Sequence, residues 1–114
     1  MKKNIILFFS AFLLICTSAV AQMNQAQADQ KAQQLLNQYQ ADLELTIEQV
    51  TDFHQTISSY LMKREEIENK ALAPDARKSA LMALSNEETT KMASILNSNQ
   101  LKLYKKLKPK IQPM

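Results

Sequence analysis

The chain contains a single histidine, His54, and the groups around it decide whether the sequence encodes chemistry. Asp52 stands two positions before it, and a carboxylate beside an imidazole is a common pair for general acid–base catalysis. Residues two apart on a helix point away from each other, however, so these two side chains do not form such a pair. We therefore predict no catalytic residue, no metal site and no cofactor. We interpret His54 as a packed residue on an apolar helix face.

Cysteine and glycine usage excludes further classes of protein. The one cysteine, Cys16, lies in an apolar N-terminal stretch, and the 114 residues contain no glycine. Phosphate-binding loops and nucleophile elbows depend on backbone conformations that glycine supplies. Tight hairpin turns between strands also lean on glycine and asparagine. The sequence therefore predicts an all-α protein without enzymatic activity.

The first residues have the layout of a secretory signal peptide over residues 1–21. MKKN supplies positive charge, IILFFSAFLLIC is apolar, and Ala19-Val20-Ala21 ends the stretch with small residues before Gln22. The apolar run is short for a membrane span, which needs about 20 residues. An uncleaved anchor and lipid attachment at Cys16 are the alternatives, although Ile15 stands where a lipoprotein has a small residue. We expect export to the periplasm and cleavage near Ala21.

The exported chain would be nearly neutral. Without Lys2 and Lys3, 12 basic residues face 11 acidic ones, so the net charge falls to about +1. Five of the lysines crowd the C-terminal end: Lys102, Lys105, Lys106, Lys108 and Lys110. Such an end is typical of a solvated helix terminus favoured by the helix dipole, and it could also touch acidic partners or lipid headgroups. Few aromatic residues and little net charge argue against a nucleic-acid partner.

The apolar pattern predicts three to four helices. Residues 22–34 are rich in glutamine and alanine. We expect this segment to be partly frayed, at its first few residues, and a helix to run over 35–43. Apolar residues three and four apart predict a second helix from Ile47 to about Ala71. Pro74 then opens the next helix, because proline is favoured in a first turn.

The last third of the chain predicts one or two more helices. Pro109 and Pro113 are expected to end them and to leave a short tail over 109–114. The helical domain is therefore expected to span 35–108.

Three segments look like helix starts of one kind. In LTIEQ, Thr46 can accept a hydrogen bond from the backbone of Gln49, whose side chain can reach back to Thr46. Leu45 and Val50 are spaced as the hydrophobic staple of such a capping box. The same pattern recurs in LSNEE and LNSNQ, with caps Ser85 and Asn97. The residues of the two repeats are Leu84, Ser85 and Glu88, and Leu96, Asn97 and Gln100.

At these positions the chain resembles the Spy/CpxP family of small periplasmic proteins from Gram-negative bacteria, which carry paired LTxxQ motifs. Leu45, Thr46 and Gln49 match the first motif. Leu96, Gln100 and Tyr104 match the second, with Asn97 in place of threonine, and asparagine is an equally good N-cap. The resemblance covers roughly residues 35–108 and the signal peptide.

The resemblance implies a thin, curved cradle of hairpin-like helices, and a homodimer. It implies either ATP-independent chaperone activity or restraint of an envelope-stress sensor kinase. Some relatives bind zinc through histidines, but this chain has only His54, so zinc binding is not carried over.

We consider three functions. The leading one is an exported chaperone-like protein that binds unfolded or aggregation-prone envelope proteins. The alternative is a periplasmic regulator that docks on a sensor kinase. The second alternative is a helical protein that binds membrane surfaces through residues 102–110. Its apolar face would consist of Leu103, Tyr104, Leu107 and Ile111.

Residues on both sides of the second helix could leave an apolar strip exposed for clients. The candidate client-binding residues are Phe53, Tyr60, Met62, Met82 and Met92; methionine adapts well to varied partners. The competing interpretation is that each of these residues belongs to the core or to a dimer seam.

Overall fold

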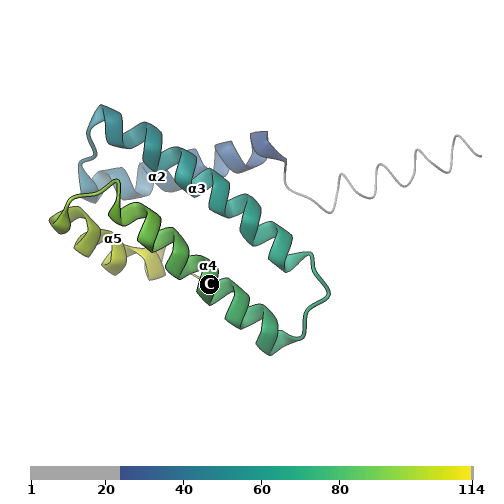
Figure 1. The fold of residues 1–114 in the computed structure, drawn as a ribbon. Helices are drawn as coiled ribbons and strands as arrows, with labels where there is room; N and C mark the ends of the chain where they lie inside the picture. Colours follow the sequence, from purple (N-terminus) through teal and green to yellow (C-terminus); the bar gives the residue numbers. More distant parts are fainter. Residues whose placement is uncertain (1–23, 114) are drawn as a thin grey trace, which may run out of the picture.

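The computed structural model describes residues 24–113 and contains four helices (Figure 1). They are α2 (Gln25–Leu43), α3 (Ile47–Glu68), α4 (Pro74–Ala93) and α5 (Ser98–Ile111). No strand occurs within residues 24–113, which confirms the all-α prediction for this part of the chain. The signal peptide predicted over 1–21 lies outside the described residues.

Helix α2 begins at Gln25, ten residues before the expected helix start at Leu35, so the segment expected to be partly frayed is helical from Gln25 onward. Asn24 caps the helix through a reciprocal box with Gln27, in which each side chain accepts a hydrogen bond from the other residue's backbone. Ala28 and Ala32 are fully buried. Because their side chains are so small, the first turns of α2 can lie close against α3.

The turn between α2 and α3 is made without glycine. Glu44 adopts a left-handed conformation with φ of 53°, and it is the one residue with positive φ between 24 and 113. The Gln40 side chain bonds both backbone groups of Leu45, the residue after Glu44. It accepts from Leu45 N at 2.9 Å and donates to Leu45 O at 3.3 Å. These bonds help to hold Glu44 in its left-handed conformation, which is unusual for residues other than glycine, asparagine and aspartate.

Two further boundaries differ from the sequence-based prediction. Helix α4 runs unbroken from Pro74 to Ala93, so Ser85 lies inside it and does not begin a helix. Helix α5 continues past Pro109 to Ile111, so the tail predicted over 109–114 was wrong. Pro109 lies in the last turn of α5, where its missing N–H removes one backbone hydrogen bond.

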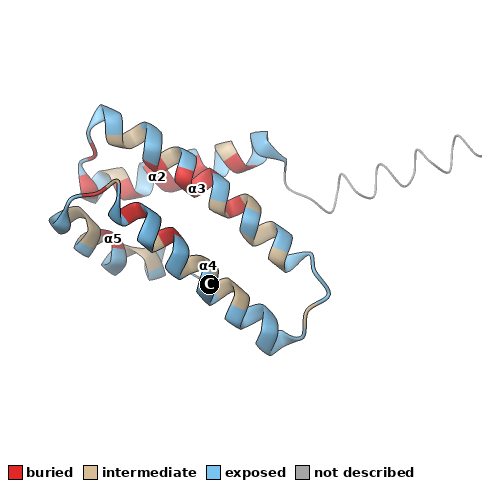
Figure 2. Cartoon of the chain, in the orientation of Figure 1, coloured by how far each residue is buried: buried red, intermediate tan, exposed pale blue. Residues whose placement is uncertain are grey.

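The helices are arranged in a ring in which each packs on two others. Helix α2 packs on α3 and α5, and α4 packs on the same two helices. The core fills the end of the molecule where all four meet, as the red segments of Figure 2 show. Its large residues include Tyr39, Phe53, Ile57, Met92 and Tyr104, each fully buried.

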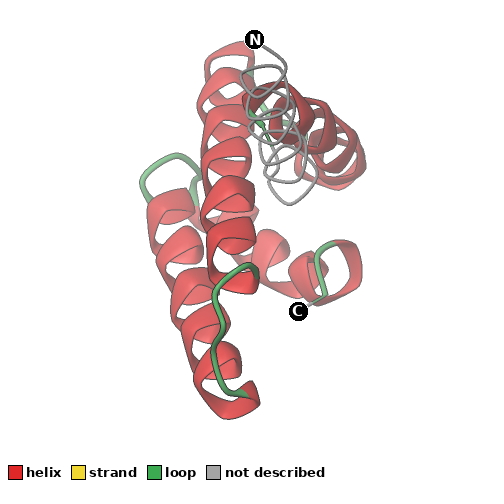
Figure 3. Cartoon of the chain, turned by 90° about the vertical axis from the view of Figure 1, so that its right-hand side faces the viewer, coloured by secondary structure: helices red, strands yellow, loops and turns green. Residues whose placement is uncertain are grey.

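The other end of the molecule is built mainly from the second half of α3 and the first half of α4. No residue from 62 to 87 is buried, and we call this stretch the distal hairpin. Figure 3 shows its turn and the start of α4 extending beyond α2 and α5. The molecule therefore combines a packed four-helix end with a two-helix extension.

Candidate functional site

The LTIEQ and LNSNQ segments both start helices, as predicted. The Thr46 side chain accepts from Gln49 N at 3.2 Å, and Gln49 Oε1 accepts from Thr46 N at 3.0 Å. Asn97 and Gln100 repeat this geometry at 2.8 and 3.0 Å. Leu45 and Leu96, which precede the two caps, are buried in the core. Each motif therefore fixes the first turn of a helix and ties it to the core.

The two motifs also meet in space, which the sequence did not reveal. Gln49 Nε2 donates to Gln100 Oε1 at 2.8 Å, and Gln100 Nε2 donates to Gln49 Oε1 at 3.1 Å. The remaining donor of each amide bonds the chain just before the other motif, Ile95 O for Gln49 and Leu43 O for Gln100. This glutamine bridge joins the α2–α3 turn to the α4–α5 turn.

The third segment predicted to start a helix, LSNEE, lies inside α4 and starts none. The Ser85 carbonyl accepts from Thr89 Oγ1 at 3.1 Å. Such a bond from a threonine to the carbonyl four positions earlier is typical of a helix interior. Good helix formers surround it in ALMALSNEE, and no residue nearby breaks the helix. Glu88 turns into the core and is only 4 % exposed. The serine and glutamate have the right spacing for a box, but the backbone around them stays helical.

Three aromatic rings from three helices form the centre of the core. Tyr39, Phe53 and Tyr104 lie with ring centroids 5.2 to 5.9 Å apart. Such spacing is favourable for aromatic pairs. The Tyr39 hydroxyl donates to Gln112 Oε1 at 2.6 Å, and the Tyr104 hydroxyl donates to Glu88 Oε1 at 3.1 Å. Burial raises the pKa of both hydroxyls well above the usual tyrosine range, and the Glu88 carboxylate raises it further.

An ion pair closes α5 onto α4 beside these rings. Lys108 Nζ lies 2.9 Å from Glu88 Oε1, and it also donates to Ser85 O and Thr89 Oγ1. The side chains are 13 % and 6 % exposed. Lys108 follows Tyr104 by four positions, so the same apolar face of α5 carries both. That four-residue spacing is the signal in the sequence for the inward role of Lys108, which was predicted only as part of a solvated basic helix end.

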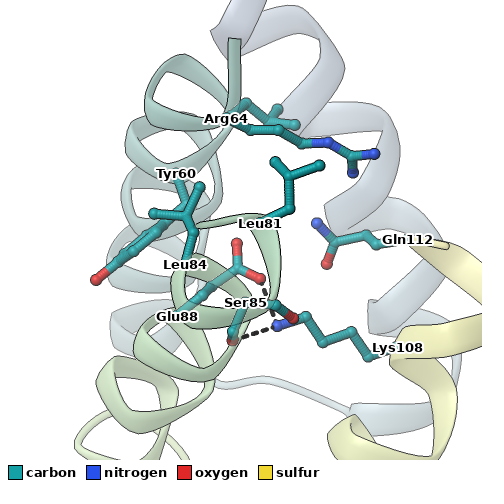
Figure 4. A pocket seen from close by; sticks show the side chains of 9 residues that line it. Tyr60, Arg64, Leu81, Leu84, Ser85, Glu88, Lys108 and Gln112 are labelled. Carbon is teal, nitrogen blue, oxygen red and sulfur yellow. Dashed lines mark hydrogen bonds and ion pairs between the residues drawn. The ribbon is translucent and has the colours of Figure 1, made fainter. Parts of the chain in front are cut away.

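A small hollow opens where α3, α4 and α5 meet (Figure 4). Its volume is about 40 Å³, enough for a water molecule or two. Tyr60, Leu81 and Leu84 line one part, and Glu88, Lys108 and Gln112 line another. In Figure 4, Lys108 reaches from α5 to Glu88, and Gln112, which directly follows α5, points into the same space. The hollow therefore lies at the base of the distal hairpin and has both an apolar and a charged wall.

The five candidate client-binding residues do not share one surface. Phe53 and Met92 are fully buried in the core, so their assignment to a binding surface was wrong. Both lie on the side of their helix that faces the other helices. Tyr60 and Met62 are half-buried, and Met82 is 47 % exposed. The remaining three lie at the base of the distal hairpin or within it.

His54 lies near a serine and an aspartate, but the three do not form a catalytic set. The Ser58 hydroxyl donates to Asp29 Oδ1 at 2.6 Å, and His54 Nε2 lies 3.0 Å from the backbone oxygen of Asp29. No bond links serine to histidine, which nucleophilic catalysis requires. Bonds from Ser58 and Gln25 lower the pKa of the Asp29 carboxyl. The cluster holds α2 against α3, with half-buried His54 at its edge.

Residues 24–113 contain neither a candidate metal cluster nor a candidate membrane span. No group of three or more histidine, cysteine or acidic side chains there is arranged to hold a metal ion. None of the four helices has the length and apolarity needed to cross a bilayer.

Comparisons with protein-family models, with curated proteins and with solved structures found no significant match.

Proposed function

We propose that the chain is a binding protein of the chaperone type, which holds apolar segments of unfolded or aggregation-prone envelope proteins on its distal hairpin. The observation that carries the proposal is the absence of any buried residue between 62 and 87. This stretch nevertheless contains Ile67, Leu72, Leu81 and Leu84, all half-buried. They lie outside the core cluster and outside the residues packed against it. Apolar surface left open in this way is typical of a site for a partner.

We call these four residues the apolar strip, and their surroundings fit varied clients. Met82 is 47 % exposed on α4, and methionine side chains adapt to different apolar partners. The hollow at the base of the hairpin has an apolar wall of Tyr60, Leu81 and Leu84. The resemblance to the Spy/CpxP family supports the same function.

The test is suppression of light scattering by an aggregating, chemically unfolded client, using the chain from Gln22 onward. The variant Ile67→Gln/Leu72→Gln/Met82→Gln removes apolar surface from the hairpin, and we expect it to lose most of the suppression. The matched control is Ile47→Gln, because Ile47 is 88 % exposed at the opposite end of α3. We expect this control to keep full activity. No suppression by the unaltered protein at a stoichiometric ratio would reject the proposal.

Two further outcomes assign the hairpin to other roles. If the triple variant suppresses aggregation normally but changes from dimer to monomer in sedimentation velocity, the strip is a dimer seam. If the protein enriches a single envelope protein in pull-downs, and that enrichment needs the hairpin, the protein is a regulator of that partner. A chaperone is expected to enrich many proteins.

A further inference from the structure

Helix α5 presents a continuous basic face to solvent. Lys102, Lys105, Lys106 and Lys110 are all exposed, and their spacing of three and four places them on one side of the helix. The helix contains five lysines and no acidic residue. We call these four residues the lysine face. None of them forms an ion pair within residues 24–113.

The opposite side of α5 is already used by the fold. Leu101, Leu103, Leu107 and Ile111 pack against the core, and Tyr104 is fully buried. The apolar face that the sequence analysis assigned to membrane insertion therefore points into the molecule, and that part of the membrane-binding interpretation was wrong. Lys108 is also turned inward, onto Glu88. The exposed side of the folded α5 is therefore dominated by lysine charge rather than by apolar side chains.

The lysine face is unfavourable for the isolated helix. Lys102 and Lys106, and likewise Lys106 and Lys110, are four apart, and like charges at this spacing repel. Three basic residues elsewhere on α3 and α5 do have acidic partners: Lys63 pairs with Glu87, Arg64 with Glu68 and Lys108 with Glu88. An arrangement that breaks a local rule without a compensating contact in the fold is expected at functional sites.

The residue types on the face indicate which anion would bind. Lysine is a compact point charge, whereas arginine is the usual choice for bidentate recognition of particular carboxylates or phosphates. The face contains no arginine, and the single aromatic residue of α5, Tyr104, is buried, so nucleic-acid bases have no side chain on which to stack. Lysines in a row suit a surface of many mobile charges better than one defined anionic group.

We propose that the lysine face of α5 docks the protein on a bilayer surface rich in anionic headgroups, by electrostatic contact and without insertion of apolar side chains. Clusters of lysine beside an anionic leaflet bind in this additive way. Contact with the headgroups also relieves the repulsion among the four lysines. The docking leaves the distal hairpin, at the far end of α3 and α4, unoccupied. The proposal does not depend on the chaperone function.

The test is co-sedimentation of the full chain with vesicles of phosphatidylglycerol and phosphatidylcholine, compared with vesicles of phosphatidylcholine alone. The apolar N-terminal run is common to all variants, so the difference between the two lipid mixtures isolates the charge-dependent part. We expect a preference for anionic vesicles that is largely lost when salt rises from about 0.05 to about 0.5 M. Each lysine replaced by glutamine is expected to weaken this preference about fivefold.

A matched pair of variants separates the face from net charge. The variant K102Q/K105Q/K106Q/K110Q removes the face, and K31Q/K70Q/K78Q/K91Q removes four other exposed lysines. Both lower the charge by the same amount. We expect the first to lose the preference for anionic vesicles by nearly three orders of magnitude, and the second to lose much less. Far-UV circular dichroism and thermal melts check that both variants are folded.

Three outcomes would overturn the proposal. One is the absence of any preference for anionic vesicles at low salt. A second is an equal loss of binding in the two lysine variants, which would mean that only net charge matters. The third is binding to polyglutamate through the lysine face without binding to vesicles, which would assign the face to acidic proteins.

Discussion

At the scale of single residues, Gln49 and Gln100 each do two things that can be separated by mutation. The oxygen of Gln49 completes the capping box of α3, and its nitrogen donates to Ile95 O and to Gln100. Glutamate at this position keeps the oxygen that caps the helix, and its charge suits a helix N-terminus. It loses the two N–H donors of the Gln49 amide, and with them the bonds to Ile95 O and Gln100 Oε1.

We therefore expect Gln49→Glu to destabilise the fold by about 1–3 kcal/mol, because acceptors in a partly buried site lose their partners. Urea unfolding followed by circular dichroism measures the change. Gln55→Glu is the control, since Gln55 is exposed on the same helix, and its effect should stay within about 0.5 kcal/mol. Equal effects of the two changes would mean that the bridge contributes nothing to stability.

At the scale of the helices, local sequence signals identified the start of α3 and α5 because caps act over four residues. They failed where a helix depends on distant contacts. The start of α2 is supported by Ala28 and Ala32 against α3, and a glutamine- and alanine-rich segment does not show that in advance. Ser85 fulfils the spacing of a box, but the inward position of Glu88 is set by Tyr104 and Lys108 on α5.

The Glu88–Lys108 pair is the main polar link between α4 and α5. Removal of one partner leaves the other charge in a largely buried position, which is costly. We expect Glu88→Ala to destabilise the fold by about 3 kcal/mol. The double variant Glu88→Met/Lys108→Met should recover much of that loss, because it removes both charges and keeps apolar volume. Thermal unfolding of the three proteins measures this.

Glu87 provides the comparison for this prediction. It precedes Glu88 directly, and its ion pair with Lys63 is 3.9 Å long and solvent-exposed. Exposed pairs contribute about 0–1 kcal/mol. Glu87→Ala should therefore have a much smaller effect than Glu88→Ala. A double methionine variant less stable than Glu88→Ala would show that the ion pair itself, and not the unpaired lysine, matters most.

At the scale of the whole molecule, the buried tyrosines make stability depend on alkaline pH. In the unfolded chain tyrosine ionises near pH 10, whereas burial raises the pKa of Tyr39 and Tyr104 in the fold. The raised pKa means that the folded state keeps these protons. Stability from this source is therefore fully present below about pH 10 and is lost as pH rises above that value.

We expect the free energy of unfolding to fall above pH 10 with a contribution of about 1.4 kcal/mol per pH unit from each of the two tyrosines. Tyrosinate absorbance and the helical circular dichroism signal should then change together. Tyr104→Phe should reduce the slope by one tyrosine's share. Ionisation of all three tyrosines near pH 10 with the helical signal unchanged would contradict this prediction.

The candidate site could be predicted only in part, for a physical reason. Sequence patterns identify apolar residues but not which of them the fold covers, so Phe53 and Met82 looked alike although one is fully buried and the other is 47 % exposed. The distal hairpin did leave a signal. Between Ile67 and Leu81, Leu72 is the single large apolar residue, too few to bury two helices.

The distal hairpin should also be the least stable part of the domain. There α3 and α4 contribute no buried residue, and short helices without extensive packing are marginal in water. We expect native-state hydrogen exchange, followed by mass spectrometry, to show opening of residues 66–80 at a lower free energy than residues 50–61 and 88–96. A bound apolar client should slow exchange in the hairpin first. Equal opening free energies throughout would mean that the hairpin is held as firmly as the core, leaving little room to adapt to varied clients.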